Sequence, residues 1–327
     1  MAQPNTLAGY NGKKFTLNTG AAIPAIGLGT FQDPDEQFMS VLTALKTGYR
    51  HIDTAHIYGT EKQVGDGIRQ SGVPREDVFV TTKLWCNAHH PKDVEPALDA
   101  SLADLGVEHV DLYLMHYPCA FKSGEDLLPF DVDGKIITEQ IPFIDTWRAM
   151  EKLLVTGKVR AIGVSNFSKT ELEVILREGS VVPAVHQIEL HPYLQQPEFV
   201  AWHHTHGIQI VQFSPCGNLN NFYRKVSWGK EVSHMIRLID HPDLAKVAKK
   251  HNKTAVQTAL AWAISQGRAV IPKSVIEWQI KENLGAQFDL DEEDLEVIAT
   301  MDKKARFNDP STNFGYQLYI GLDGAAT

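Results

Sequence analysis

The feature that most constrains the fold is a series of eight strand-like segments, each followed by a stretch with helical periodicity. The segments are AIGLG, YRHIDT, VFVTTK, VDLYLMH, VRAIGVSN, AVHQIEL, IQIVQFS and AVIPKS, all between residues 25 and 274. Apolar or β-branched runs that alternate with helices are typical of a parallel sheet with crossover helices. Eight such units within roughly 250 residues predict an α/β fold, a closed (β/α)8 TIM barrel.

No linker rich in Pro, Gly and Ser divides the 327 residues, so we expect one domain over 1–327. Three additions fit around the barrel: an N-terminal β-hairpin at 13–24, a long loop after the seventh strand at 217–241 and a C-terminal tail at 302–327. A doubly wound nucleotide-binding fold is disfavoured, because GLGTFQ has Gln32 where the third glycine of the fingerprint belongs.

Helix signals support the barrel. Apolar residues share one helical face over 94–105. Ser168 with Glu171 forms a capping-box pattern, and Thr60 with Gln63 offers another helix start.

Charge and cysteine content exclude several classes of protein. The chain has 31 Lys and Arg against 40 Asp and Glu, and the formal net charge of -9 gives no reason to expect nucleic acid or an anionic membrane as a partner. The first 30 residues lack the apolar core of a signal peptide, and no stretch reaches the ~18 apolar residues of a spanning helix. An odd set of three cysteines, Cys86, Cys119 and Cys216, indicates a reducing compartment. We therefore expect a cytoplasmic protein.

Unusual polar side chains follow the second, third and fourth predicted strands. Asp53 ends the second, with Tyr58 shortly beyond, Lys83 ends the third and His116 the fourth. Barrel enzymes place their chemistry at these strand ends, and neighbouring strands bring the four groups together. An ammonium ~4 Å from a phenol lowers the phenol pKa from about 10 by roughly three units. We expect Tyr58 to be a general acid, Asp53 to keep Lys83 charged, and neutral His116 to polarise a carbonyl. Taken alone, Asp53 and Lys83 also fit a structural ion pair.

A proton delivered to oxygen is half of a carbonyl reduction, and a nicotinamide would supply the hydride that side chains cannot. The remaining strand ends offer amide and hydroxyl groups for a carboxamide, an aromatic face for the nicotinamide ring and a cation for an extra phosphate. These residues are Ser165, Asn166, Gln187, Phe213, Lys273 and Ser274.

The chain resembles the aldo-keto reductase family over nearly its whole length. The matching stretches are GLGTFQ, GYRHIDTAHIYGTEKQVGDGI, TTKLW, DLYLMHYP, GKVRAIGVSNFS, HQIELHPYL, FSPCG and IPKSV. The resemblance implies the same barrel, with Tyr58 as proton donor and Asp53, Lys83 and His116 completing a catalytic tetrad. The cofactor contacts that we expect are Thr30, Ser165, Asn166, Gln187, Phe213, Ser214, Lys273, Ser274, Gln279 and Asn283.

Departures from the family pattern bear on the cofactor. Gln279 stands where the family usually has an arginine for the adenosine 2'-phosphate. Losing that charge-assisted pair removes about 1.5 to 3 kcal/mol. We therefore expect the preference for NADPH over NADH to be smaller than is usual in the family. NADPH remains the expected cofactor, with NADH also accepted.

The substrate pocket is expected to have an aromatic rim. Phe31, Trp85, Tyr117 and Phe121 follow strand ends, and Lys122 could meet a carboxylate at the mouth. Phe31 and Tyr117 stand where many family members carry tryptophan. The general pattern resembles fungal reductases of aldoses, glyceraldehyde and uronates such as D-galacturonate. We expect a small hydrophilic aldehyde as substrate, and a monomer or weak dimer.

Three alternatives stay open from the sequence. One is a nucleotide-sensing regulatory subunit with a vestigial reductase site, and another is a polyol dehydrogenase that runs in the oxidative direction. The third, a metallohydrolase, depends on two histidine clusters, His89 with His90 and His203 with His204 and His206. Both clusters fit exposed helix ends or loops better than a tetrahedral site, so no metal is expected.

Overall fold

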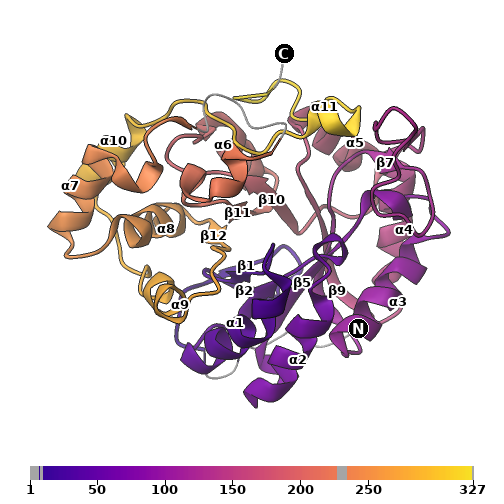
Figure 1. The fold of residues 1–327 in the computed structure, drawn as a ribbon, viewed down its shortest axis with the longest axis horizontal. Coiled ribbons are helices and arrows are strands. Elements are labelled where there is room, and N and C mark those ends of the chain that lie inside the picture. The colour runs from indigo at the N-terminus through magenta and orange to yellow at the C-terminus, as the bar shows by residue number, and fades with distance from the viewer. Residues whose placement is uncertain (1–6, 8–9, 227–233, 326–327) are drawn as a thin grey trace.

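The computed structural model describes residues 7, 10–226 and 234–325, and its centre is a parallel β-barrel (Figure 1). One eight-stranded sheet runs in the order β12-β11-β10-β9-β6-β5-β4-β3. Parallel bridges from Ile26 to Val270 and from Gly29 to Lys273 join its two edges. The predicted closed (β/α)8 barrel is therefore confirmed. Its strands are β3 (Leu28–Gly29), β4 (His51–Asp53), β5 (Phe79–Leu84), β6 (Val110–Met115), β9 (Val159–Ser165), β10 (Val185–Glu189), β11 (Gln209–Phe213) and β12 (Ala269–Val270).

Alternate side chains of the strands belong to two different apolar clusters. On β6, Leu112 and Leu114 pack with the N-terminal hairpin residue Ile23, whereas Tyr113 and Met115 pack in the larger cluster that includes the helices. This period of two follows from the pleat of a strand that is buried on both faces. The hairpin, β1 (Lys14–Thr16) paired with β2 (Ala22–Pro24), lies within the predicted range 13–24. Its residue Ile23 belongs to the same apolar cluster as Leu112 and Leu114.

Helices surround the barrel, as Figure 1 shows. Helix α3 follows the predicted periodicity, and α5 begins with the predicted capping box, in which Ser168 N donates to Glu171 Oε2 at 2.7 Å. Thr60 does precede α2, but its side chain bonds Thr54 instead of capping the helix. The helices are α1 (Pro34–Thr47), α2 (Glu61–Ser71), α3 (Val94–Leu105), α4 (Phe143–Leu153), α5 (Lys169–Glu178), α6 (Pro197–Thr205), α7 (Pro242–Lys250), α8 (Ala255–Ser265), α9 (Glu277–Leu284), α10 (Glu292–Ala299) and α11 (Ser311–Phe314).

Loops and tail lie at the edge of the barrel where the strands end. A hairpin that the sequence did not predict, β7 (Ala120–Phe121) with β8 (Thr138–Glu139), follows β6. The predicted loop 217–241 contains short 3-10 turns at Gly217–Leu219, Asn221–Arg224 and Leu238–Asp240, and its residues 227–233 lie outside the described part of the chain. In Figure 1 the yellow C-terminal segment runs from α10 to α11 beside β7, and Phe314 packs on Phe121 with ring centroids 5.0 Å apart.

Buried Glu189, the last residue of β10, fixes the start of the tail. Its carboxylate accepts hydrogen bonds from the backbone N–H groups of Phe307 at 2.7 Å and Asn308 at 2.9 Å. No helix among the described residues has the length and apolar character needed to cross a membrane.

Candidate active site

The four predicted catalytic side chains converge at the ends of β4, β5 and β6. Lys83 Nζ donates to Asp53 Oδ1 at 2.6 Å, to the backbone oxygen of Thr54 at 2.8 Å and to the Tyr58 hydroxyl at 3.4 Å. The Tyr58 and His116 rings lie 5.7 Å apart, edge to face. The predicted convergence is therefore confirmed.

The electrostatics of Tyr58 differ from the expectation. Burial raises the pKa of Tyr58 well above 10, and the charge of Asp53 raises it further. Burial also lowers the pKa of Lys83, against the opposing effect of Asp53. The direction is opposite to the predicted decrease, because the prediction considered the charge of Lys83 and left out burial and the negative charge of Asp53.

His116 is a neutral imidazole, as expected. Burial lowers its pKa well below 6.5, and the charge of Lys83 lowers it further. Its ring stacks on Tyr117 with centroids 5.2 Å apart and meets Trp85 edge to face at 5.1 Å. Its Nδ1 atom is buried without a hydrogen-bond partner among the described residues. The imidazole is therefore fixed by ring packing next to Tyr58.

Residues expected to grip a carboxamide are joined directly to these four groups. Gln187 Nε2 donates to Asp53 Oδ2 at 2.6 Å, and Ser165 Oγ donates to the Gln187 backbone oxygen at 2.9 Å. Asn166 Nδ2 donates to the backbone oxygen of His116 and to Ser165 Oγ, both at 3.0 Å. One hydrogen-bonded network thus holds the amides of β9 and β10 and the carboxylate of β4.

Thr30 and the end of β11 complete this side of the site. Buried Thr30 donates through its hydroxyl to the backbone oxygen of Asp53 at 3.0 Å, so it supports the β4 end. Phe213 is half-buried, and Ser214, with φ 51°, bonds the hydroxyl of Tyr223. Asn308 Nδ2 donates to both hydroxyl oxygens, at 3.3 and 3.1 Å. Tyr223 and Asn308 were not predicted as site residues, because they lie in segments without periodicity.

The residues expected near an extra phosphate gather after β12. Lys273 forms an ion pair with Asp33, the residue before α1, which the sequence did not single out. Ser274 Oγ donates to Gln279 Oε1 at 2.7 Å, and Asn283 is buried in α9. Gln279 therefore lies next to the hydroxyl of Ser274.

Two of the predicted rim residues are buried: Trp85 is 5% exposed, with its ring against His116, and Phe121 is 1% exposed. Phe121 packs between Trp85 and Phe314, so its placement on the rim is wrong. The β7–β8 hairpin and the tail cover it, a tertiary effect that the local sequence does not encode. Phe31 is 40% exposed and lies 5.1 Å from the Tyr58 ring, centroid to centroid. Lys122 is exposed, as expected.

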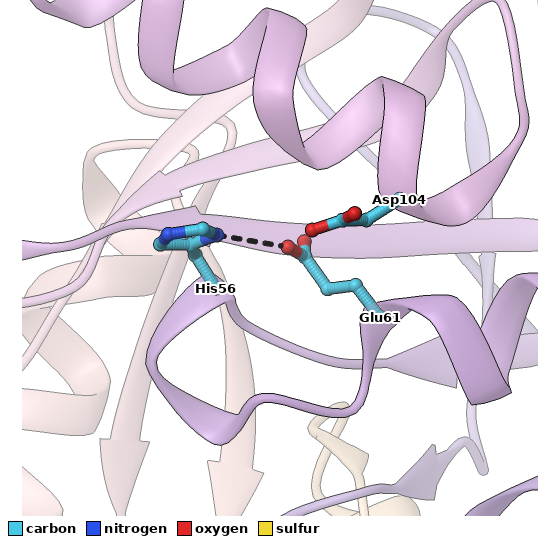
Figure 2. Close-up of side chains that lie close together, drawn as sticks. All are labelled: His56, Glu61 and Asp104. Carbon is cyan, nitrogen blue, oxygen red and sulfur yellow. Dashed lines mark hydrogen bonds and ion pairs between the residues drawn. The ribbon is translucent and has the colours of Figure 1, made fainter. Parts of the chain in front are cut away.

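The turn that carries Tyr58 is tied to β5 by the buried carboxylate of Glu61. One Glu61 oxygen bonds His56 Nδ1 at 3.2 Å (Figure 2), and the other accepts from the Thr82 hydroxyl at 2.5 Å. The hydrogen bond to Glu61 raises the pKa of His56. Asp104 lies beside them. One atom from each of His56, Glu61 and Asp104 could bind a metal ion, and these three atoms lie within 4.8 Å of one another. Because both Glu61 oxygens already bind protein groups, we assign this cluster a structural role.

Each histidine cluster has one buried member, whereas His90, His204 and His206 are exposed as expected. His203 is fully buried, and its Nε2 atom lies 2.7 Å from Nδ1 of buried His186. His89 is also buried. The expectation failed for these two residues because each faces the core, while the neighbouring His90 and His204 are exposed.

Comparisons with known proteins agree with this geometry. A model of the Aldo/keto reductase family matches residues 20–303. An uncharacterized oxidoreductase of Schizosaccharomyces pombe is 48% identical over 316 residues, which cover 96% of this chain and 95% of that protein. The D/L-glyceraldehyde reductase of Hypocrea jecorina is 41% identical over 313 residues and 92% of each chain. The structure of an aldose reductase from Schistosoma japonicum superposes with a TM-score of 0.86 at 32% identity, covering 94% of this chain and 98% of that one. This chain belongs to the aldo/keto reductase family.

Proposed function

We propose that this oxidoreductase reduces the carbonyl of a hydrophilic aldehyde to the alcohol, with Tyr58 as the proton donor and NADPH as the preferred cofactor. The observation that carries the proposal is the chain of contacts from the Tyr58 hydroxyl to Lys83 Nζ at 3.4 Å and on to Asp53 at 2.6 Å. A buried phenol beside an ammonium is the arrangement that proton donation to a developing alkoxide requires.

The residues present fit a nicotinamide dinucleotide. The amides of Asn166, just after β9, and Gln187, within β10, suit a carboxamide. The half-buried face of Phe213 suits a flat ring, and Lys273 with Ser274 suits a phosphate. The bound cofactor would supply the hydride. Membership of the family implies NAD(P)H.

This chain's own side chains handle the proton. Neutral His116 donates a hydrogen bond to the substrate carbonyl oxygen and orients it toward Tyr58. The Tyr58 O–H bond breaks as its proton moves to that oxygen, and Lys83 stabilises the phenolate that remains. Asp53, held by Gln187, keeps the ammonium in place. Because burial raises the Tyr58 pKa in the unliganded site, the proton stays on the phenol until a basic oxygen forms next to it.

The substrate class is inferred from the rim and from one relative. Phe31 and Tyr117 offer aromatic faces on which a sugar-like chain can pack, and exposed Lys122 offers a charge for a uronate carboxylate. A relative at 41% identity is named a D/L-glyceraldehyde reductase. We therefore propose glyceraldehyde, aldoses and uronates as the substrates to test, and the cytoplasm as the compartment of a monomer or weak dimer.

The decisive experiment is an NADPH-oxidation screen over these aldehydes with wild type and Tyr58→Phe. We expect turnover of at least one aldehyde, and a 10²- to 10⁴-fold lower kcat in the variant with unchanged NADPH binding, which is about the range of general acid catalysis. Normal turnover in Tyr58→Phe would refute the mechanism. Tight NADPH binding without turnover would indicate a regulatory subunit, and faster NADP⁺-dependent oxidation of the alcohols would indicate a polyol dehydrogenase.

Cofactor preference is tested at position 279. Gln279 bonds Ser274 and supplies no positive charge, so we expect NADPH to bind more tightly than NADH by a modest ratio. Gln279→Arg should widen the ratio of the two Kd values about tenfold or more, because a guanidinium adds a charge-assisted contact to a phosphate. An unchanged ratio would show that this position does not contact the 2'-phosphate.

A further inference from the structure

The C-terminal tail reaches the centre of the site through one side chain. The hydroxyl of Tyr319 donates to Asn166 Oδ1 at 2.9 Å, across 153 positions of sequence. Tyr319 is 1% exposed and Asn166 is 2% exposed. A buried polar group without a hydrogen-bond partner is energetically costly. The bond therefore restrains the side chains of both Tyr319 and Asn166.

Both partners of this bond have a left-handed backbone, with φ 60° at Tyr319 and φ 63° at Asn166. Asparagine tolerates this region, but a residue with a large side chain rarely adopts it. Such a conformation persists when the surrounding structure enforces it, and it is enriched at functional sites. The surrounding contacts therefore hold Tyr319 in this conformation.

The tyrosine ring is fixed by a buried arginine. The Arg306 guanidinium lies 3.9 Å from the centroid of the Tyr319 ring. Arg306 Nη2 donates to the Asp323 backbone oxygen at 3.1 Å and to Gln196 Oε1 at 3.3 Å. The phenol is thus positioned by the tail on one side and by the residue before α6 on the other.

The Asn166 amide is oriented by its partners. Its two N–H bonds point to the His116 backbone oxygen and to Ser165 Oγ, and its oxygen accepts from Tyr319. A carbonyl oxygen has two acceptor sites, so Oδ1 can accept a second hydrogen bond. A flipped amide would place Oδ1 against the backbone oxygen of His116, which can only accept, so the amide keeps its oxygen on the side of the Tyr319 hydroxyl.

We propose that Tyr319 is a positioning residue for the nicotinamide carboxamide. It holds Asn166 Oδ1 so that the second acceptor site takes an N–H of that carboxamide. This inference depends on the proposed NAD(P)H-dependent function and adds a residue from outside the barrel to it.

The test compares two tyrosines of the tail. Tyr319→Phe keeps the ring over Arg306 and removes the hydroxyl. Tyr316→Phe is the matched control, because the Tyr316 hydroxyl donates to Glu171 Oε1 at 2.6 Å, in the cap of α5. We would titrate each protein with NADPH and with adenosine 2',5'-bisphosphate, which carries no nicotinamide, and record circular dichroism spectra to verify folding.

We expect Tyr319→Phe to raise the NADPH Kd about three- to tenfold, the effect of one buried hydrogen bond, and to leave bisphosphate binding unchanged. Tyr316→Phe should change neither. An analogue with an acetyl group in place of the carboxamide should bind less tightly than NADPH to wild type, and the difference should shrink in Tyr319→Phe.

The inference would be overturned by an unchanged NADPH Kd in Tyr319→Phe, or by an equal loss of bisphosphate affinity, which would indicate a general structural effect. Failure of wild type to bind NADPH at all would refute the proposed function, and the inference with it. Binding without turnover would refute only the reductase activity, since the carboxamide contact would remain measurable.

Discussion

Two lysine–aspartate pairs lie at the ends of barrel strands, and they differ mainly in burial. Lys83 and Asp53 have side chains 0% and 2% exposed and are 2.6 Å apart. Lys273 and Asp33 have side chains 25% and 48% exposed. The first pair has further partners in Thr54 and Gln187. Burial with several partners makes a rigid pair, suited to chemistry.

The second pair is open to exchange. A partly exposed ion pair contributes about 0 to 1 kcal/mol, because water and salt screen it, so a phosphate can replace Asp33 as the partner of Lys273 at little cost. Under the proposed function, the buried pair would serve proton transfer and the exposed pair would serve reversible anion binding.

Removing the buried cation should have the largest effect. Lys83→Met leaves Asp53 in a buried site without its charged partner, so we expect the free energy of unfolding to fall by about 3 to 5 kcal/mol and kcat to fall at least about 10²-fold. Urea denaturation and steady-state kinetics measure the two effects. The double variant Lys83→Met with Asp53→Asn should regain part of the stability and none of the activity. A single variant as stable as wild type would contradict the comparison.

Removing the exposed cation should affect binding and hardly affect stability. We expect Lys273→Met to raise the NADPH Kd about 10- to 100-fold, the value of a charged contact, and to change the free energy of unfolding by less than about 1 kcal/mol. Asp33→Asn should tighten NADPH binding, because Lys273 loses its competing partner. Lys281→Met, which removes an exposed pair with Glu277, is the control and should leave the Kd unchanged. Weaker binding in Asp33→Asn would show that Asp33 orients Lys273 instead of competing for it.

Burial should also control the response to acid. Burial lowers the pKa of His89 to about 3, so the folded protein keeps it neutral while the unfolded chain takes up a proton below about pH 6.5. Stability from this residue is therefore complete above pH 6.5 and falls by about 1.4 kcal/mol per pH unit as the pH decreases toward 3.

His89→Leu should flatten the pH dependence of the unfolding free energy by that amount, since neither ring nitrogen of His89 has a partner to lose among the described residues. Exposed His90 offers the control, His90→Gln, for which we expect the wild-type slope. Chemical denaturation at pH 7.5, 6.0 and 5.0 measures the unfolding free energy of each variant and so gives this slope. An identical slope in His89→Leu would mean that His89 is not neutral in the folded protein.

Local sequence was enough to predict the strands and the residues at their ends. Period and composition identify a buried strand, and the chain places Asp53, Lys83 and His116 at fixed offsets from three adjacent ones. Closure of the sheet brings these offsets together, so the convergence followed from the barrel itself. The capping box at Ser168 was predictable for the same reason, since both partners lie within one turn.

Features that depend on distant segments were missed or misjudged. Phe121 is buried by the tail and by its own hairpin, and the contact of Tyr319 with Asn166 joins segments that have no common pattern. The shift of the Tyr58 pKa was predicted with the wrong sign, because a charge is visible in the sequence while desolvation is not.

By itself the sequence determined the eightfold alternation, the family and the identity of the polar groups at the strand ends, because these depend on local periodicity and on residue type. Tertiary structure alone decided which lysine is buried and which is exchangeable, and which tail residue reaches the site. The physical reason is that burial and long-range contacts are properties of the packed chain, and they set the dielectric environment in which each charge acts.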